Sequence, residues 1–529
     1  MISLSHFNER AETFLKRAAI VIIMAAALFL VVTSLYCRVD MNMENSSLEN
    51  VVLMRDSIFL NLIVLAAAAT LGAFFFRTDL SDKANPRILS LILFLWVVAF
   101  GTAFILTSRS APTHDSYIVT VTGWKASTGD LSEFERVYYQ RFPFQLGYVL
   151  WTELFCRLFS LGNNFLPLEI VNVFCLAIGE ALLLDASFDL FEDRKVTALL
   201  FLFCLLFIQP VLFCSFLYGT VPGFLFAVLM IRCFQKFRQS GKLLWALPMA
   251  LCGALAVLLK LNNMIPVAAL IIVFVLILLR EYKDPKQYIA LVLLLAAVFG
   301  LKGSAVLLYE KRTDRDFGDG IPMICWAAMG MTSHSISEGW YDARYTVVNF
   351  EKTGLDPAAT GELAKQGISE RMEYFAEKPK EAFSFFTKKI VSQWHETTYQ
   401  SVWTNQVRGQ YGEKIGIAKW ICGDGEKPVK DYMNRFSVLI FSGFLFSLFF
   451  LWKKETKPEL LLLPIVFIGG FLYHTVFEGK SQYIVTYMVF LLPYAAYGWV
   501  NGCRYLADLV RSFKKEKENE RMTSADDFK

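Results

Sequence analysis

The sequence predicts an all-α polytopic membrane protein, and three observations carry that prediction. Hydrophobic residues make up 55% of the 529 residues and charged residues only 19%, and the mean hydropathy is +0.44. Soluble domains do not have this composition. Apolar stretches of about 18 residues or more, long enough to cross a bilayer as helices, recur along the chain. Lysine and arginine gather beside these stretches, where they set the orientation in the membrane.

Twelve segments are apolar enough to be predicted as membrane spans. In chain order they are 18–36, 58–76, 88–107, 166–188, 195–214, 217–235, 243–260, 264–280, 287–309, 434–452, 459–475 and 482–500. The first span follows Arg10, Lys16 and Arg17, and no small-residue cleavage site comes after it. We therefore expect a retained helix there and not a signal peptide.

The connections between spans predict the topology. Residues 232–242, 280–286 and 453–457 are basic, and so is the tail after Gly502. The positive-inside rule places these segments and both termini in the cytoplasm, so the two long polar segments, 108–145 and 310–433, lie outside. The net charge of +4 is too small to indicate a nucleic-acid partner.

The predicted organisation has four parts. Residues 1–309 form an N-terminal membrane domain that includes the 108–145 loop, and residues 310–433 form an extracytoplasmic segment. Residues 434–502 carry the last spans, and residues 503–529 form a basic cytoplasmic tail.

Two segments outside these spans are predicted to be interfacial helices. Residues 145–162 would reverse the orientation of every later loop if they crossed the membrane, and Glu153 and Arg157 lie one helical turn apart within them. We interpret this segment as an interfacial or re-entrant helix, and leave open whether it crosses. Residues 381–394 place aromatic side chains at helical spacing. They predict an amphipathic helix that lies on the membrane surface and roofs a cavity.

Asp115 is the leading catalytic candidate. It stands in residues 111–117 (Ala-Pro-Thr-His-Asp-Ser-Tyr), just beyond the span 88–107. A carboxylate at the edge of the bilayer can accept a proton from a hydroxyl nucleophile while a lipid-borne donor lies in the membrane. The alternative is that Asp115 only caps a helix beginning at Ser116. His114 adjoins Asp115 and is a candidate for the same site.

Several polar residues at predicted outer span ends are candidates for substrate binding. Lys260 ends a span on the side where the positive-inside rule does not explain it, so it can bind the phosphate of a lipid-linked donor. The alternative for Lys260 is snorkelling to headgroups. Residues 478–483 (Glu-Gly-Lys-Ser-Gln-Tyr) form a short outer loop that can hold a phosphate or sugar, or that is only a solvated turn. Arg141 lies where the chain returns to the membrane.

The remaining chemistry-bearing residues are less specific. Four of the five histidines fall on predicted outer surfaces without ligand spacing, and are surface histidines in the alternative interpretation. Trp326, Trp340 and Tyr341 can stack on a sugar or isoprenoid, or pack against the membrane surface. Most cysteines lie in apolar stretches, where they act as small hydrophobes. Cys325 and Cys422 lie in the polar segment, and the sequence leaves open whether they form a disulfide.

These residues resemble the GT-C-fold glycosyltransferases that use polyprenyl-phosphate sugars. The nearest group is the bacterial relatives of dolichyl-phosphate-mannose protein mannosyltransferases and of aminoarabinose transferases. The acid of the family's first outer loop matches Asp115, the lysine ending a mid-chain span matches Lys260, and the late Glu-Xaa-Arg-Xaa-Arg-Tyr pattern resembles residues 478–483. Residues 326–330, 339–341 and 393–396 look like a Gram-positive branch of this superfamily.

Three departures from the family pattern are visible. Ser116 follows Asp115 where many mannosyltransferases have a second acid, and Lys480 and Gln482 replace the usual arginines. Two predicted spans precede the one that leads to Asp115, where one is usual.

The resemblance implies a GT-C-like bundle of about twelve transmembrane helices and an inverting sugar transfer at an extracytoplasmic site. Asp115 would be the base, and the donor phosphate would meet Lys260, with Lys480 or Arg141 beside it. His114, Glu478 and Tyr483 would complete the substrate site. The partners would be a polyprenyl-phosphate sugar, membrane lipid, and a hydroxyl acceptor on a glycan, lipid or protein. No cofactor is certain, and a divalent metal stays open because the nearby acids include Asp130, Glu133 and Glu135.

Two other functions fit parts of the same pattern. A secondary transporter or lipid-linked oligosaccharide flippase would explain twelve spans with both termini inside, and predicts charged or Gly/Pro-broken residues at mid-membrane depth. Most of the predicted spans lack such residues, and Pro210 and Glu180 are the exceptions. A polysaccharide polymerase or ligase would share the lipid-linked substrates but would transfer whole chains.

Overall fold

The computed structural model describes residues 4–41, 49–75, 83–159, 164–334, 336–453 and 456–526. All twelve predicted apolar segments are helical within these ranges. Parts of four predictions lie outside the described residues: the end of the second span at 76, residues 160–162, Lys454 and the last three residues of the tail. The side chains of the basic tail from residue 514 onward lie outside the description as well.

The helices that form the apolar body follow the predicted order. They are α1 (Leu4–Tyr36), α2 (Ile58–Phe75), α3 (Pro86–Ser108), α7 (Leu166–Phe191), α8 (Arg194–Leu206), α9 (Gln209–Leu212), α10 (Thr220–Ser240), α11 (Ala246–Leu259), α12 (Met264–Arg280), α13 (Pro285–Lys302), α21 (Glu426–Lys453), α22 (Leu462–Val476) and α23 (Val485–Asp526). The body is thus an all-α, multi-pass membrane architecture, as predicted.

Fewer helices meet the length and hydropathy of a full span than the predicted number of about twelve. Eight helices in the described ranges do, or nine if the bent pair α8–α9 is one span. Two predicted spans are shorter apolar helices, Ile58–Ala73 and Leu243–Leu259, and another is the first part of α23. The predicted span 195–214 is a bent helix pair, because the helix breaks after Leu206 and the chain bends by 41°.

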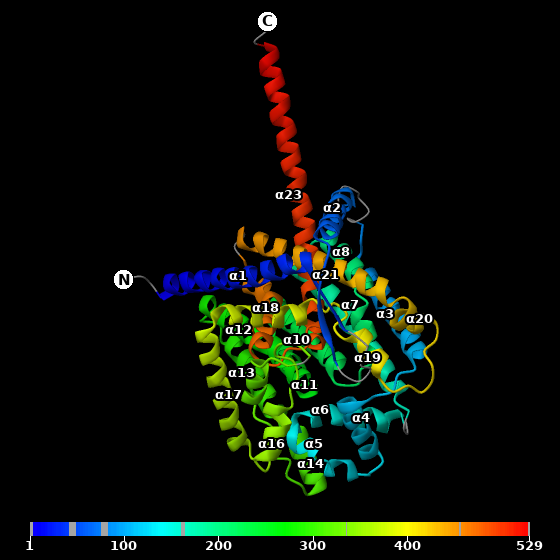
Figure 1. Cartoon of the computed structure of the whole chain (residues 1–529). Coiled ribbons are helices and arrows are strands. Elements are labelled where there is room, and N and C mark those ends of the chain that lie inside the picture. The colour runs from blue at the N-terminus through cyan, green and yellow to red at the C-terminus, as the bar shows by residue number, and fades with distance from the viewer. Residues whose placement is uncertain are drawn as a thin grey trace.

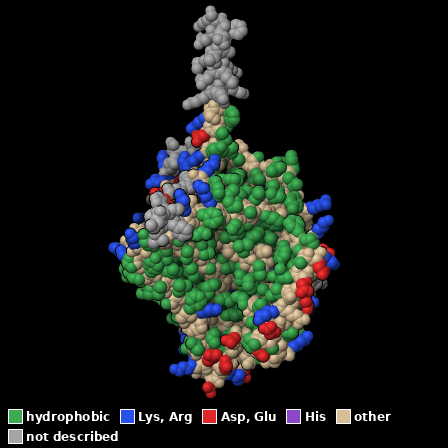
Figure 2. All heavy atoms as spheres, turned by 90° about the vertical axis from the view of Figure 1, so that its left-hand side faces the viewer, with side chains coloured by type: hydrophobic (Ala, Val, Ile, Leu, Met, Phe, Trp, Pro, Cys, Tyr) green, Lys and Arg blue, Asp and Glu red, His purple; other side chains and the backbone are tan. Residues whose placement is uncertain are grey.

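Exposed apolar side chains mark the surface that would face lipid. Most of the middle of the face in Figure 2 is hydrophobic, whereas charged side chains gather toward its upper and lower ends. In the span Pro285–Thr313, which comprises α13 and α14 (Ser304–Thr313), only 17% of the residues in the apolar stretch are buried within the protein. Side chains such as Val292 and Phe299 are exposed on it. An apolar surface of this kind is stable only in a bilayer.

The first part of α23 is an exception because it lies inside the bundle. Met488, Leu492 and Val500 are fully buried, and α21 packs along this helix. A Cβ added at Gly498 would collide with the carbonyl oxygen of Gly443, so glycine permits the close approach of the two helices. A helix surrounded by protein can carry tyrosine and tryptophan, and this explains its weaker hydropathy.

The remaining elements are a short hairpin and ten helices that are not in the list above. They are the hairpin β1 (Cys37–Met41) and β2 (Val51–Arg55), with Cys37 opposite Arg55, and the helices α4 (His114–Ser127), α5 (Val137–Arg141), α6 (Leu146–Phe159), α14 (Ser304–Thr313), α15 (Ile324–Gly330), α16 (Asn349–Lys352), α17 (Pro357–Glu377), α18 (Pro379–Trp394), α19 (Ser401–Val407) and α20 (Gly416–Lys419). Figure 1 shows α4, α5, α6 and α14 at the bottom, opposite the end from which α23 projects.

The basic connections meet at the other end. Arg238 forms ion pairs with Glu281 at 2.6 Å and Glu459 at 2.7 Å, and Arg504 pairs with Asp193 at 2.6 Å. The first two contacts join three connections that are far apart in the sequence, and the third joins the chain after Gly502 to the α7–α8 connection. These ion pairs agree with the predicted grouping of the basic loops, and the side of the membrane that the loops face stays a prediction.

The two predicted interfacial helices differ from each other. With 14 residues α6 is too short for a full span, and its buried Glu153 binds Arg157, Arg312 and Tyr309 at 2.6–2.8 Å. The prediction that 381–394 lies on the membrane surface was wrong for its second half. Trp394 of α18 is buried against Phe467 of α22, because the apolar face of α18 packs into the bundle.

All ten cysteines lie in the described ranges, and all are free. The disulfide left open between Cys325 and Cys422 is therefore absent. Cys325 is buried in α15 and Cys422 follows α20, in separate apolar clusters.

Candidate functional site

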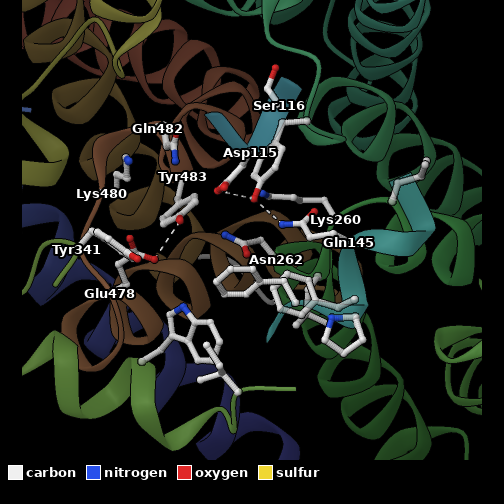
Figure 3. A pocket seen from close by; sticks show the side chains of 18 of the residues that line it. Asp115, Ser116, Gln145, Lys260, Asn262, Tyr341, Glu478, Lys480, Gln482 and Tyr483 are labelled. Atoms are coloured by element: carbon white, nitrogen blue, oxygen red, sulfur yellow. Dashed lines mark hydrogen bonds between the residues drawn. The ribbon is translucent and has the colours of Figure 1, made fainter. Parts of the chain in front are cut away.

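A cavity of about 1220 Å³ lies among several of these elements. Its walls come from the start of α4, the connections after α9 and α11, α13 and α14, and residues 478–483 between α22 and α23. Figure 3 shows side chains from these segments pointing into one space. Ligand pockets usually have about 300–1,000 Å³, so this cavity has room for more than one small ligand.

Asp115 lies in the first turn of α4 and lines the cavity. The N-cap of this helix is Thr113, so the alternative in which Asp115 caps a helix from Ser116 was wrong. The carboxylate Oδ2 accepts a hydrogen bond of 3.2 Å from the Tyr218 hydroxyl. The Gln145 amide in turn donates to that hydroxyl (Figure 3). Backbone N–H groups at the helix start favour a negative charge at this position.

Lys260 follows the last residue of α11 and lies outside both neighbouring helices. Its Nζ stands 3.9 Å from the ring centre of Tyr218 and 5.9 Å from that of Tyr483. It forms no ion pair with any acidic residue that the structure describes. Burial lowers the pKa of Lys260 to about 8, although Asp115 and Glu478 favour its charged form. Lys260 points into the cavity (Figure 3).

The predicted loop 478–483 is a buried turn and not a solvated one. Glu478 is 8% exposed and accepts a hydrogen bond of 3.0 Å from the Tyr483 hydroxyl. Burial raises the pKa of Glu478, against the effect of nearby Lys480. Lys480 forms an ion pair with Glu49, which precedes β2. The turn thus brings a carboxyl, a cation and a phenol to the cavity wall.

His114 and Arg141 have different outcomes. His114 is exposed and lines the cavity beside Asp115, as expected. Arg141 pairs with Glu351 of α16 and does not line the cavity. Its assignment to the donor site was wrong because α5 ends at this residue and its guanidinium is paired with Glu351, outside the cavity wall.

The aromatic predictions were right in part. Trp326 and Tyr341 line the cavity. Trp340 does not, because it is fully buried and its Nε1 donates to Ser392 at 2.8 Å. The residues that sequence reasoning missed are Tyr218 and Gln145. Tyr218 had one signal in the sequence, the Tyr-Gly pair near the start of the predicted span 217–235, and Gly219 does adopt a positive φ of 80° just before α10.

The other histidines and acids provide no metal site in the described chain. His395 and His474 are buried, and His474 Nδ1 lies 3.0 Å from the Glu478 carbonyl oxygen. Glu133 and Asp130 pair with Lys125 at 2.7 and 3.6 Å, away from the cavity wall. No group of three His, Cys, Asp or Glu side chains gathers among the residues that could be searched.

Comparison with known proteins places the chain at the level of a family. No curated protein matches the chain. A family model described as "conserved hypothetical integral membrane protein" matches residues 9–502. Because this match covers most of the sequence, the chain belongs to that family of integral membrane proteins.

Proposed function

We propose that this protein is an integral membrane glycosyltransferase, which moves a sugar from a polyprenyl-phosphate donor to a hydroxyl acceptor. One observation carries the proposal: Lys260 is a cation without an ion-pair partner among the described residues, in the same cavity as Asp115. A buried cation between two tyrosine rings is well suited to a phosphate. A nearby carboxylate supplies a base.

An apolar wall supports a lipid-linked donor. Phe299 of α13 and Leu307 of α14 line the cavity while being 65% and 68% exposed. Because most of the α13 surface is not covered by other parts of the protein, an isoprenoid chain bound along this wall would continue into the bilayer. The isoprenoid would lie against α13 and α14, and the phosphate would meet Lys260.

The reaction follows from these positions. Asp115 takes the proton of the acceptor hydroxyl, and the hydroxyl oxygen bonds to the anomeric carbon. The bond from that carbon to the phosphate oxygen breaks, and its electron pair leaves with the phosphate, whose charge Lys260 offsets. Attack opposite the leaving group inverts the anomeric configuration. Positioning and electrostatic stabilisation supply most of the catalysis.

The acceptor side of the reaction is extracytoplasmic in this proposal. The basic connections lie at the opposite end from the cavity, and the positive-inside rule places them in the cytoplasm. Both termini would then be cytoplasmic. Acceptor hydroxyls on cell-wall glycans, lipids or proteins all fit an outward-facing site.

One observation favours a transporter or flippase as a second candidate. Glu180, in the middle of α7, is 1% exposed, and neither carboxyl oxygen has a hydrogen-bond partner in the described chain. The bent pair α8–α9 also resembles the broken helices of transporter sites. A buried acid of this kind marks ion or proton pathways in many membrane proteins.

Sugar transfer by purified protein tests the proposal. With a polyprenyl-phosphate sugar donor, we expect the wild type to transfer sugar and Asp115→Asn to be slower by about 100- to 10,000-fold. Asn keeps the shape of Asp115 but cannot accept the proton. The control is Asp130→Asn, since Asp130 lies outside the cavity wall. Near-normal transfer by Asp115→Asn would remove this residue from the mechanism. If the wild type transfers no sugar, a transporter or flippase becomes the favoured function.

A further inference from the structure

The helix α18 turns three polar side chains toward the segment that carries Glu478, Lys480 and Tyr483. Lys389 and Gln393 are one turn apart on the same face of α18, and Glu396 follows just past its end. We call these three residues the α18 clamp. None of them lines the cavity.

Lys389 holds the end of α22. It is 0% exposed, and its Nζ donates hydrogen bonds to the carbonyl oxygens of Phe477 at 2.7 Å, Thr475 at 3.0 Å and Gly330 at 2.5 Å. The last carbonyls of a helix have no partner within the helix, and a cation there also offsets the helix dipole. Lys389 therefore fixes the point at which the chain leaves α22 and enters the 478–483 turn.

The other two clamp residues extend this contact along the turn. The Gln393 amide donates to the His474 carbonyl oxygen at 3.3 Å. Glu396 is buried and accepts from the Ser481 hydroxyl at 2.7 Å and from the Gln400 backbone N–H at 2.6 Å. A Cβ at Gly479 would stand 2.7 Å from the Gln393 amide nitrogen, so glycine lets the turn lie directly on α18.

We propose that Lys389 and Glu396 are positioning residues, which hold the turn so that Glu478, Lys480 and Tyr483 form the cavity wall beside Lys260, where the donor phosphate would bind. The choice of ligand rests on the proposed function, whereas the positioning rests on the contacts of α18. These contacts also give a role to residues 393–396 (Gln-Trp-His-Glu), which the proposed chemistry does not use. The clamp acts from outside the cavity, through the backbone of residues 474–481.

Hydrogen exchange tests the clamp without any assumption about the reaction. In the full-length protein, we expect amides of 474–483 to exchange about 10-fold faster or more in Lys389→Met and Glu396→Gln, because each change removes hydrogen bonds of a charged group. Ser481→Ala removes the Glu396 contact from the other side and should have a smaller effect in the same direction. If Lys389→Met and Glu396→Gln do not fold, Ser481→Ala still tests the clamp. The controls are Lys388→Met and Glu381→Gln, which change exposed side chains of the same helix.

Binding of polyprenyl phosphate to the same variants tests the positioning role. We expect affinity to fall about 10-fold for Lys389→Met and Glu396→Gln while the controls match the wild type. Unchanged exchange in 474–483 would overturn the clamp. Faster exchange with unchanged affinity in folded protein would overturn the positioning role and leave α18 only structural. If the wild type binds no polyprenyl phosphate, the proposed function fails, while faster exchange in the variants would still support the clamp.

Discussion

Replacement of Lys260 by methionine is the sharpest test of the phosphate site. Lys260 has no acidic partner at ion-pair distance among the described residues, and its Nζ lies 3.9 Å from the Tyr218 ring centre. A bound phosphate would therefore be its first anionic partner. The loss of a hydrogen bond to a charged group costs about 1.5–3 kcal/mol, which is about 10- to 150-fold in affinity.

The substitution should leave the fold intact. Methionine keeps an unbranched apolar stem and contacts aromatic rings with about 0.3–1.5 kcal/mol. This offsets most of the cation–π energy, about 0.5–2 kcal/mol, that Lys260 gains from Tyr218. We therefore expect a similar melting temperature and a large loss of ligand affinity.

The assay is equilibrium binding of polyprenyl phosphate to purified protein in lipid nanodiscs. Lys302→Met is the matched control, since Lys302 lines the same cavity but is exposed. Solvent screening limits an exposed charge to about 0–1 kcal/mol, or about 5-fold at most. If Lys260→Met binds as tightly as the wild type, or if both variants lose affinity equally, Lys260 is not the phosphate ligand.

Three further outcomes follow from the site and the topology. Since burial lowers the pKa of Lys260 to about 8, lipid-phosphate affinity should stay constant below that pH and fall as the pH rises through it. Lys260→Arg should keep the affinity constant to higher pH, because arginine stays charged. A pH-independent affinity of the wild type would contradict the assignment. Tyr218→Phe keeps the ring beneath Lys260 but loses the bond to Asp115. Sugar transfer should slow about 10-fold with donor affinity unchanged, as kinetics at varied donor would show. A cysteine introduced at Glu362, an exposed position, should react with an impermeant label in intact cells. A cysteine introduced at Lys283 should react only after lysis. The reverse labelling pattern would show that the topology is inverted.

Local properties of the sequence determined the helical architecture. The length and hydropathy of each apolar stretch depend only on neighbouring residues, so all twelve stretches were found as helices. The basic connections also predicted which loops share one end, because the parity of crossings links every loop to the next. The same reasoning placed Asp115, Lys260 and the 478–483 loop together at the opposite end.

Hydropathy could not distinguish a lipid-facing surface from a protein-facing one. Lipid and the protein interior are both apolar, so α18 and the first part of α23 were not predicted to be buried. The same limitation explains the break between α8 and α9, where the buried Gln209 amide binds the Thr397 carbonyl oxygen at 2.9 Å. That partner is 188 residues away in the chain.

Only the tertiary structure decided which charged groups are paired. The sequence named Lys480 and Arg141 as further candidates for the phosphate beside Lys260, yet they pair with Glu49 and Glu351. Lys260 instead lies between the rings of Tyr218 and Tyr483, which come from different connections. An ion pair depends on the distance between side chains that folding brings together, and sequence spacing does not report that distance. The sequence therefore identified several residues that line the cavity, and the packing of the helices determined which of their cations lacks an ion-pair partner among the described residues.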